Sequence, residues 1–393
     1  MKNLKEGEYI STLIQNVSRN AIPNLIAFQT FKPSKVIWIC PEDAKQYFEK
    51  LCQWARTEVP QQELWSVDTS NPKKLMSQLM TKFSCLNSKV QYVYHLSSGP
   101  KILTSIGMSA FLLNFDQKHG EVIVYDEPNQ SFDVLYPTEC DDQYHGALVS
   151  LEAMLKAHGN TLHPKGVIRT LDECWKRLPY IERLKKIASD VKRAMQGKVL
   201  KGLHAPSSTS RKFTLISKKN GKAIHEFPEP LISAFRIVEE IGLLKNLMVN
   251  SNGHLTFSTH DNNVYGYING GWLEDWVGGV LADLEWSGAG VGVQVLMDAA
   301  LSNNDSQEID FLGVRNNKLV YLSCKHTTKL TSDELFELDS LRDDLCGDGS
   351  FTIGIIHAGA IGSGMMDKAK RLNINVISPW GKNAAQELKQ LIS

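Results

Sequence analysis

The amino-acid sequence predicts an α/β protein built from two modules with a less regular region between them. Residues 1–140 alternate short apolar runs with helical patterns, which is typical of a parallel sheet covered by helices. Residues 266–393 begin with a helical pattern and continue through glycine-broken and alternating runs, which predict a second sheet with its own helices. At 393 residues the chain is long enough for two or three domains with proper cores.

The first 140 residues are expected to form a Rossmann-like unit, in which ligands bind beyond the carboxyl ends of the strands. The predicted strands are Tyr9–Ile14, Val36–Cys40, Leu64–Val67 and Val90–His95, followed by a hairpin of Glu121–Asp126 and Ser131–Tyr136. The predicted helices are Pro23–Thr30, Asp43–Arg56, Pro72–Phe83 and Lys101–Phe115. Two polar loops, residues 15–20 and 95–101, follow the first and fourth strands and are the candidate ligand-binding segments.

The second of these loops has the composition of an anion site. Ser97, Ser98 and Gly99 precede a predicted helix that begins at Lys101. Small residues at a helix N-terminus present backbone N–H groups to an anion, the helix dipole favours negative charge, and the lysine adds a positive charge. The loop lacks the spacing of a P-loop. The same composition also fits an ordinary helix capped by a serine, so the loop alone leaves both interpretations open.

Residues 141–265 form the least regular part of the sequence and are expected to be a linker and helical region. Leu171–Ala194 has a helical pattern with many basic residues, which fits either a path for nucleic acid or a solvated helix face. The stretch from Leu203 to Lys222 is rich in serine, lysine and glycine and is expected to be a mobile loop. An amphipathic helix at Leu231–Leu247, a turn and a strand at Leu255–Thr259 suggest a small winged-helix-like segment.

A β-hairpin in the C-terminal module can be built residue by residue. Asn316-Asn317 lies between two alternating runs, which is the composition of a tight two-residue turn with positive φ. With these two residues in the turn, Arg315 faces Lys318 and the register continues along both strands. Because side chains alternate between faces, one face is predicted to be apolar and the other charged. The predicted apolar face comprises Ile309, Phe311, Val320, Leu322 and Cys324.

The polar face of this hairpin gathers Glu308, Asp310, Ser323 and Lys325 at its open end. Carboxylates hold Mg²⁺ or Mn²⁺, and such a metal polarises a phosphate and lowers the pKa of a bound water. A neighbouring lysine orients that water and balances developing negative charge. Glu274, on the preceding predicted helix, is placed to supply a third acid. The pattern predicts metal-assisted phosphodiester cleavage, and the alternative is a solvated sheet edge with an incidental ion pair.

Composition narrows the classes of function. Lys+Arg and Asp+Glu are both 43, so the chain is not basic throughout, although a local cationic groove is compatible with this balance. The seven cysteines include no C-x-x-C pair, which predicts a reduced, cytoplasmic protein without structural zinc. We expect no membrane partner, because we find neither a membrane-spanning apolar run nor a signal peptide. Strands at Phe351–His357 and Val376–Ser378 and a helix at Ala384–Leu391 are predicted to complete the C-terminal module.

A helix glutamate, a strand aspartate and a lysine on the next strand resemble the restriction-endonuclease-like PD-(D/E)xK nuclease core. The segments Trp272-Leu273-Glu274, Glu308-Ile309-Asp310, Arg315-Asn316-Asn317 and Cys324-Lys325 resemble one branch of it, the CRISPR ancillary nucleases. That family joins an N-terminal cyclic-oligoadenylate sensor (CARF) domain to this nuclease core. The resemblance implies a CARF-like domain at 1–140 and a restriction-endonuclease-like α/β domain at 266–393.

The N-terminal module also carries the resemblance. The loop from His95 to Lys101 is similar, with several substitutions, to the sensor motif Asn-x-Thr-Gly-Gly-Thr-Lys, and Pro23-Asn24-Leu25 also looks like the family. The family sensor binds cyclic tetra-adenylate across the two-fold axis of a homodimer, which suits a symmetric ring. The resemblance implies a homodimer whose ligand-binding residues are Gln15, Asn16, Asn24, His95, Ser97, Ser98, Gly99 and Lys101.

The family's activity is that of an endonuclease of CRISPR antiviral defence, activated by cyclic tetra-adenylate. The resemblance implies cleavage of single-stranded or nicked DNA, of RNA or of both, with duplex DNA as a further candidate substrate. Glu274 and Asp310 would hold Mn²⁺ or Mg²⁺, with Glu308 as an extra ligand, and Lys325 would activate water. Ser323 departs from the family, because it stands where the Glu-x-Lys pattern has a carboxylate. The alternative is a catalytically silent regulator that binds the cyclic nucleotide.

Overall fold

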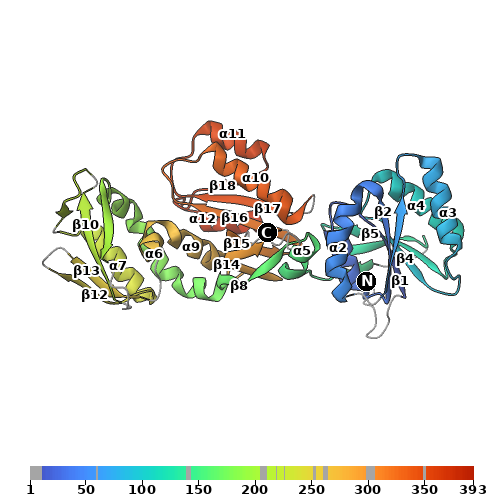
Figure 1. Cartoon of the computed structure of the whole chain (residues 1–393), viewed down its shortest axis with the longest axis horizontal. Helices are drawn as coiled ribbons and strands as arrows, with labels where there is room; N and C mark the ends of the chain where they lie inside the picture. Colours follow the sequence, from blue (N-terminus) through green and yellow to red (C-terminus); the bar gives the residue numbers. More distant parts are fainter. Residues whose placement is uncertain are drawn as a thin grey trace.

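The computed structural model describes residues 11–58, 61–138, 143–203, 210–217, 219–224, 226–250, 254–259, 264–297, 306–347 and 351–393. Three units follow one another along the longest axis of the molecule (Figure 1). The N-terminal unit occupies one end, the C-terminal part of the chain forms the central unit, and the middle of the chain forms the unit at the other end. Each unit combines a sheet with helices, so the predicted α/β class is confirmed.

The N-terminal unit contains a seven-stranded sheet in the order β3-β2-β1-β4-β5-β6-β7. The strands are β1 (Thr12–Asn16), β2 (Lys35–Pro41), β3 (Gln61–Val67), β4 (Tyr92–His95), β5 (Gly120–Asp126), β6 (Ser131–Tyr136) and β7 (Gln143–His145). Strands β3 to β5 in this order run parallel, and β6 and β7 add an antiparallel extension. The order of the strands reverses between β1 and β4, which is where ligands bind in sheets of this kind.

Two layers of helices cover this sheet, as the alternating sequence pattern predicts. Leu13 and Trp38 point into one core with the first two helices, and Ile14 and Ile37 point into the other core with the next two. Successive strand residues therefore serve opposite layers, which explains why these strands are apolar throughout. The helices are α1 (Ile22–Phe31), α2 (Lys45–Glu58) with the short η1 (Glu42–Ala44) before it, α3 (Pro72–Ser84) and α4 (Lys101–Asn114).

The central unit is built on a six-stranded sheet in the order β18-β17-β16-β15-β14-β8. Its strands are β8 (Thr161–Arg169), β14 (Gly288–Leu296), β15 (Ser306–Arg315), β16 (Lys318–Lys325), β17 (Phe351–His357) and β18 (Asn375–Ile377). One face packs against α5, α10 and α11, and the other against α6, α9 and α12. The helical segments are α5 (Leu151–Ala157), α6 (Leu171–Ala194), α8 (Val264–Gly266), the π-helical η2 (Tyr267–Gly271), α9 (Trp272–Leu281), α10 (Ser332–Cys346), α11 (Ser363–Arg371) and α12 (Ala384–Ile392).

The middle of the chain forms a five-stranded sheet that packs on α7 and the second half of α6. The strands are β9 (Lys198–Leu203), β10 (Ser210–Ser217), β11 (Ala223–Ile224), β12 (Lys245–Asn250) and β13 (His254–Ser258), and α7 is Glu229–Ile241. The predicted winged-helix-like segment corresponds to α7, β12 and β13. The prediction of a mobile loop from Leu203 to Lys222 is wrong for the described residues of this stretch, because β10 pairs with β9, β11 and β13. Phe213 stacks on Phe257, with the ring centroids 5.2 Å apart. This contact holds β10 against β13 although the residues around Phe213 are polar.

Two strands within the region that was expected to be linker and helix belong to the neighbouring sheets. β7 extends the N-terminal sheet by pairing with β6, and β8 is the edge strand of the central sheet, paired with β14. Pro164 and Gly166 interrupt the alternation within β8, and its register against β14 shifts between Val293 and Val295. Such irregularity hides the strand from pattern analysis. Asp141 and Asp142, expected to be linker, lie outside the described residues.

The predicted hairpin is confirmed in its turn and register. Asn316 and Asn317 have φ of 50° and 58°, and Arg315 pairs with Lys318 across the turn. Pairing continues in the predicted register as far as Phe311 opposite Leu322.

The single apolar face predicted for this hairpin is wrong at Ile309. Phe311 packs with α9 on one side of the sheet, whereas Ile309 packs in the core on the other side. In the neighbouring strand β14, Val291 and Val293 divide in the same way, and the residue between them is Gly292 with φ of +62°. This left-handed residue lies beside Asp310 in the register of β14 and β15 and changes the face of both strands there.

The turn of the hairpin also joins the central unit to the N-terminal unit. The Asn317 side chain donates from Nδ2 to Gln130 Oε1 at 2.9 Å and to the Ala147 carbonyl at 3.1 Å. Its Oδ1 accepts from the Val149 N–H at 2.7 Å. Only 2% of Asn317 is exposed, so this amide has exchanged its water contacts for contacts with the other unit.

We expect Asn317→Gly to lower the free energy of unfolding by about 1–3 kcal/mol, because it keeps the positive φ but leaves the buried Val149 N–H without its acceptor and removes one donor from Gln130 and the Ala147 carbonyl. Asn316→Gly is the matched control, since Asn316 lies in the same turn and is exposed. Its effect should stay within about 0.5 kcal/mol. Urea unfolding measures both, and equal effects of the two substitutions would contradict the anchoring role.

Candidate functional sites

The carboxyl ends of β1 and β4 bring polar side chains of the N-terminal unit together. Gln15 and Asn16, expected in a loop after the first strand, instead end strand β1, because that strand extends two residues beyond the predicted end at Ile14. Gln15 is opposite His95, whose Nδ1 lies 3.2 Å from Gln15 Oε1. Asn16 Oδ1 accepts from Tyr94 Oη at 2.9 Å, and Asn24 Nδ2 donates to the Asn16 carbonyl at 3.0 Å.

This polar cluster is incomplete within the described residues. Five of its buried polar atoms have no hydrogen-bond partner there, namely Gln15 Nε2, Asn16 Nδ2, Asn24 Oδ1, His95 Nε2 and Ser98 Oγ. An unpartnered buried polar group costs about 1–3 kcal/mol, so such groups are rarely gathered in one place without a function. Their concentration at the point where the strand order reverses indicates a binding site for a polar ligand.

The loop from Ser97 to Lys101 packs directly against this cluster. Gly99 has φ of +97°, and a Cβ at this position would lie 2.8 Å from Asn16 Cβ, so only glycine allows the contact. Ser97 Oγ accepts from the Tyr125 N–H at 2.5 Å, and Lys101 is exposed in the first turn of α4. The N-cap of α4 is Pro100, and no side chain caps that helix end, so the alternative of a serine-capped helix is wrong.

In the central unit, the three predicted catalytic residues meet from three elements. Glu274 comes from α9, Asp310 from β15 and Lys325 from β16. Burial, together with the nearby charge of Asp310, raises the pKa of Glu274 to about 7 against the effect of Arg169. Burial also raises the pKa of Asp310, although the Cys324 N–H and the Lys325 charge oppose this shift. The structure therefore brings two buried, interacting carboxyl groups and a lysine into one cluster.

Ser323 supports Asp310 through a hydrogen bond. Asp310 Oδ2 accepts from the Ser323 hydroxyl at 3.2 Å and from the Cys324 N–H at 2.6 Å. These two donors fix the carboxylate and leave its Oδ1 without a partner among the described residues. Ser323, which occupies the position of the family's second carboxylate, thus orients the carboxylate of Asp310.

Glu308 lies apart from this buried pair. Its side chain is exposed and accepts from Gln294 Nε2 at 2.9 Å across the pair of strands β14 and β15. Within the described part of the chain, no three His, Cys, Asp or Glu side chains form a group that could hold a metal ion. Glu274 and Asp310 nevertheless fit Mg²⁺ or Mn²⁺, because such ions bind one or two carboxylates and keep several waters. Whether Glu308 adds a ligand stays a prediction.

The sequence did not reveal a charged network behind Glu274. Asp275 is fully buried, and its carboxylate lies 2.5 Å from Arg169 Nε and 2.9 Å from Arg177 Nη1. It also accepts a hydrogen bond from Tyr267 Oη at 2.8 Å. Arg169, at the end of β8, contacts Glu274 Oε2 through Nη2. The available signal was the acidic pair at 274 and 275 inside an otherwise apolar helix, where one acid must find buried countercharges.

Comparisons with known proteins agree with this arrangement. Residues 261–392 match the family model described as Card1-like, endonuclease domain. The family resemblance inferred from the sequence is thereby confirmed for the C-terminal part of the chain. The match includes Glu274, Asp310 and Lys325 but begins after β8 and α6. A search of curated protein sequences finds no match.

Solved structures resemble the chain over almost its whole length. Can2 from Sulfobacillus thermosulfidooxidans, in complex with cyclic tetra-adenylate, matches with 16% identity and TM-score 0.66, covering 97% of this chain and 98% of that chain. Protein VC1899 from Vibrio cholerae matches with 15% identity and TM-score 0.68, covering 97% and 96%. A type III CRISPR defence DNA nuclease activated by cyclic oligoadenylate matches with 12% identity and TM-score 0.56, covering 100% of this chain and 53% of that chain. At these identities the likeness shows the fold.

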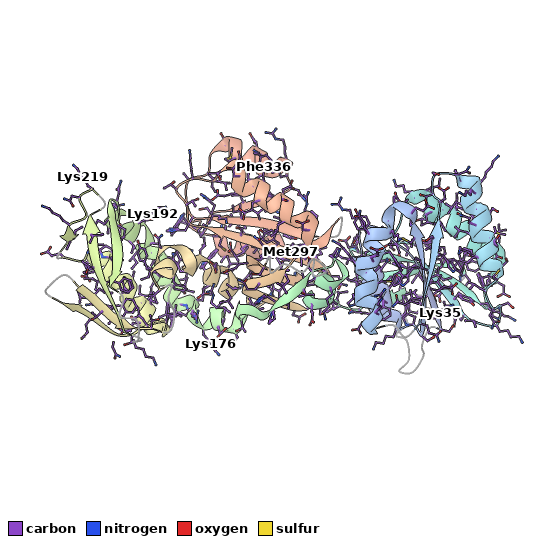
Figure 2. All side chains as sticks on the ribbon, viewed as in Figure 1. Lys35, Lys176, Lys192, Lys219, Met297 and Phe336 are labelled. Carbon is purple, nitrogen blue, oxygen red and sulfur yellow. The ribbon has the colours of Figure 1, made fainter. Side chains whose placement is uncertain are left out.

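Helix α6, predicted to be basic, packs against α9, which lies in the segment that matches the Card1-like model. Lys176 pairs with Asp172 at 2.6 Å, Arg177 pairs with Asp275, and Arg183 pairs with Glu240 at 2.5 Å. Lys192 donates instead to the Thr327 carbonyl at 3.5 Å, close to the end of β16 (Figure 2). Most of the helix therefore fits the interpretation of an ion-paired face, and its C-terminal end lies near the end of β16, the strand that carries Lys325. None of the described helices has the length and apolar character required to cross a membrane.

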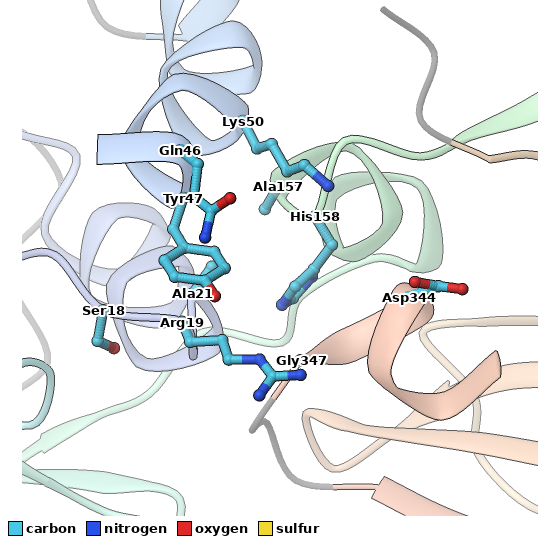
Figure 3. Close-up of a pocket in the computed structure, with 10 residues that line it drawn as sticks. All are labelled: Ser18, Arg19, Ala21, Gln46, Tyr47, Lys50, Ala157, His158, Asp344 and Gly347. Atoms are coloured by element: carbon cyan, nitrogen blue, oxygen red, sulfur yellow. The ribbon is translucent and has the colours of Figure 1, made fainter. Parts of the chain in front are cut away.

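A cavity of about 190 Å³ lies at the joint between the N-terminal and central units (Figure 3). It shares no residue with the polar cluster of the N-terminal unit or with the cluster of Glu274, Asp310 and Lys325. Its lining residues are Ser18, Arg19, Ala21, Gln46, Tyr47, Lys50, Ala157, His158, Asp344 and Gly347. The contact between the two units is thus incompletely packed, which leaves room for a change in their relative position.

Stability should fall in acid because of His95. Burial lowers the pKa of His95 from 6.5 to about 3, so the unfolded chain binds the extra proton between these values. The part of the free energy of unfolding that depends on neutral His95 is fully present above pH 6.5. It is lost at about 1.4 kcal/mol per pH unit as the pH falls toward 3. Urea unfolding as a function of pH should show a shallower acid slope for His95→Asn. His145→Asn, at an exposed site, is the control, and an unchanged slope in His95→Asn would contradict the expectation.

Asp275→Asn should lower the free energy of unfolding by about 3–5 kcal/mol, because it leaves the partly buried Arg177 without its countercharge and Arg169 with Glu274 alone. Asp283→Asn is the matched control. Asp283 pairs with Lys389 at 2.5 Å, but both side chains are substantially exposed, so its loss should cost less than about 1 kcal/mol. Urea unfolding of both variants tests this difference, and a loss below 1 kcal/mol in Asp275→Asn would show that the buried network does not stabilise the fold.

Proposed function

We propose that this protein is a metal-dependent endonuclease that is activated by a cyclic oligoadenylate, with cyclic tetra-adenylate as the first candidate. The observation that carries the proposal is the meeting of Glu274, Asp310 and Lys325 in a segment that matches the Card1-like endonuclease domain. The unpartnered polar cluster of the N-terminal unit supports a ligand site there. Can2, which resembles this chain along its length, was solved with cyclic tetra-adenylate.

The catalytic part of the proposal follows from the geometry of the three side chains. Asp310 and Glu274 would hold Mn²⁺ or Mg²⁺, which supplies Lewis acidity toward the phosphate and lowers the pKa of a bound water. Asp310 is oriented for this role by Ser323 and the Cys324 N–H. Lys325, beside Asp310, balances the negative charge that develops on the phosphate. The oxygen of water forms a bond to phosphorus, the ester bond to the leaving strand breaks, and the leaving oxygen takes up a proton.

The substrate and biological role of this activity are part of the proposal. The end of α6 near the cluster supports binding of single-stranded or nicked DNA or RNA, because Lys192 offers a positive charge beside the strand that carries Lys325. Duplex DNA is a further candidate. The fold shared with a type III CRISPR defence nuclease supports a role in antiviral defence.

A homodimer would complete the ligand site, since a ring with internal symmetry suits a two-fold axis. The exposed apolar side chains of α4, Leu113 at 67% and Ile102 at 36%, lie on the helix that follows the 95–101 loop and support a contact between two copies.

A chain of hydrogen bonds supports communication between the two clusters. Ser97, in the candidate ligand loop, accepts from the Tyr125 N–H, and Tyr125 Oη lies 2.8 Å from Gln130 Oε1. Gln130 in turn accepts from Asn317 in the hairpin whose strands carry Asp310 and Lys325. Ligand binding at the loop would shift the population of hairpin positions and so complete the nuclease site.

Cleavage of single-stranded DNA, supercoiled DNA and RNA should be followed on gels with Mn²⁺, with and without cyclic tetra-adenylate. We expect cleavage to require the ring and to fall by about 100-fold or more in Lys325→Ala, because a preorganised charge at the phosphate is lost. Lys329→Ala is the control, since it removes an exposed lysine just beyond β16 and should cleave like the wild type.

Two other outcomes would contradict parts of the proposal. Cleavage that proceeds equally without the ring would sink the regulatory part. Binding of the ring without cleavage of any substrate would identify the protein as the silent regulator, with Ser323 as the residue that removed the activity.

A further inference from the structure

Arg169 lies between two carboxylates of different character. Its Nε is 2.5 Å from Asp275 Oδ1, and its Nη2 contacts Glu274 Oε2. Asp275 is fully buried and is held independently by Arg177 and Tyr267. Glu274, by contrast, is 22% exposed at its side chain and faces the charge of Asp310. One end of the guanidinium is therefore held by the charge of Asp275, although its Nε makes no hydrogen bond among the described residues, and the Nη2 end donates to a group of the proposed catalytic cluster.

The contact with Glu274 competes with the proposed metal. A divalent ion shared by Glu274 and Asp310 must approach the carboxylate that Arg169 already neutralises, and the like charges of the ion and the guanidinium repel one another there. Because Asp275 retains the Nε side, Arg169 would stay at the site after releasing Glu274. Its Nη1 has no partner among the described residues, so two N–H-bearing nitrogens would then be available to a ligand.

The charges of the cluster indicate what that ligand is. In the ionised state, three cations (Arg169, Arg177 and Lys325) face three carboxylates (Glu274, Asp275 and Asp310). A divalent metal makes this balanced group positive by two charges. A phosphodiester and a metal-activated hydroxide would restore neutrality, and a planar guanidinium matches the geometry of two phosphate oxygens.

We propose that Arg169 is a further catalytic residue, which rests on Glu274 in the free protein and binds the non-bridging oxygens of the scissile phosphate once the metal takes Glu274. This inference rests on the proposed endonuclease function and adds to it a residue outside the segment that matches the Card1-like domain. The arginine acts first as a competitor of the metal and then as a partner of the substrate. These two roles have opposite consequences for a variant, and this makes them testable.

The experiment compares the full-length wild type with Arg169→Met, Arg169→Lys and Arg177→Met at pH 8. Mn²⁺ affinity is measured by isothermal titration calorimetry, and cleavage of single-stranded DNA gives kcat and KM in the presence of cyclic tetra-adenylate. We expect Arg169→Met to bind Mn²⁺ about tenfold more tightly and to lose at least about 100-fold in kcat/KM. Arg169→Lys, which keeps the charge without the fork, should stay near the wild type in Mn²⁺ affinity and recover only part of the cleavage.

Arg177→Met is the matched control, because Arg177 also pairs with Asp275 but no hydrogen bond or ion pair joins it to Glu274. It should not tighten Mn²⁺ binding. Circular dichroism verifies that each variant is folded. If Arg169→Met weakens both Mn²⁺ binding and cleavage, Arg169 only positions Glu274 and the inference is wrong, while the endonuclease proposal stands. If neither the wild type nor Arg169→Met binds Mn²⁺, the metal site and the inference fall together.

Discussion

The central unit depends on the burial of one negative charge. Asp275 has no exposure to solvent, and removing a carboxylate from water costs several kcal/mol unless countercharges and hydrogen bonds surround it. Those partners come from three elements: Arg169 from β8, Arg177 from α6 and Tyr267 from η2. Because these three partners converge on one buried carboxylate, they fix the position of α9 against the sheet. Glu274, the preceding residue on α9, is thereby held beside Asp310, so the geometry of the candidate catalytic cluster depends on the ion pairs that surround Asp275.

The hairpin of β15 and β16 connects the two ends of the proposed mechanism. Asn317 anchors its turn on the N-terminal unit, and Asp310 and Lys325 lie toward its open end. At roughly 3.3 Å per residue, the eight steps from Asn317 to Lys325 span about 26 Å. Two paired strands of this length are stiffer than a single loop. A displacement of the N-terminal unit against the central unit would therefore be transmitted along the hairpin to the proposed catalytic cluster. The cavity beside the joint provides space for that displacement.

The hairpin was predictable because its evidence is local. Two asparagines that tolerate positive φ fix the turn, and the turn fixes the register. Ile309 was misplaced because one left-handed glycine in the neighbouring strand reverses the alternation, and that effect acts across strands. Arg169 was missed for a related reason. Nothing in its own neighbourhood marks it, and its role exists only because β8 pairs with β14 and approaches α9. Likewise, the positions of Gln15 and His95 side by side could be expected from a parallel sheet, but their burial could not.

The position of β8 decides which residues must stay together for the central sheet to form. The segment that matches the endonuclease family begins at residue 261, yet the edge strand of its sheet ends at Arg169, and the whole middle unit lies between them in the sequence. The middle unit is therefore inserted between two strands of the central sheet, β8 and β14, and does not link the N-terminal unit to the central unit. A gene fusion made at residue 261 would leave β14 as an open edge and Asp275 without its two arginines. An exchange that preserves this sheet must therefore keep β8, the middle unit and the matched segment together, so the unit that can be exchanged is larger than residues 261–392.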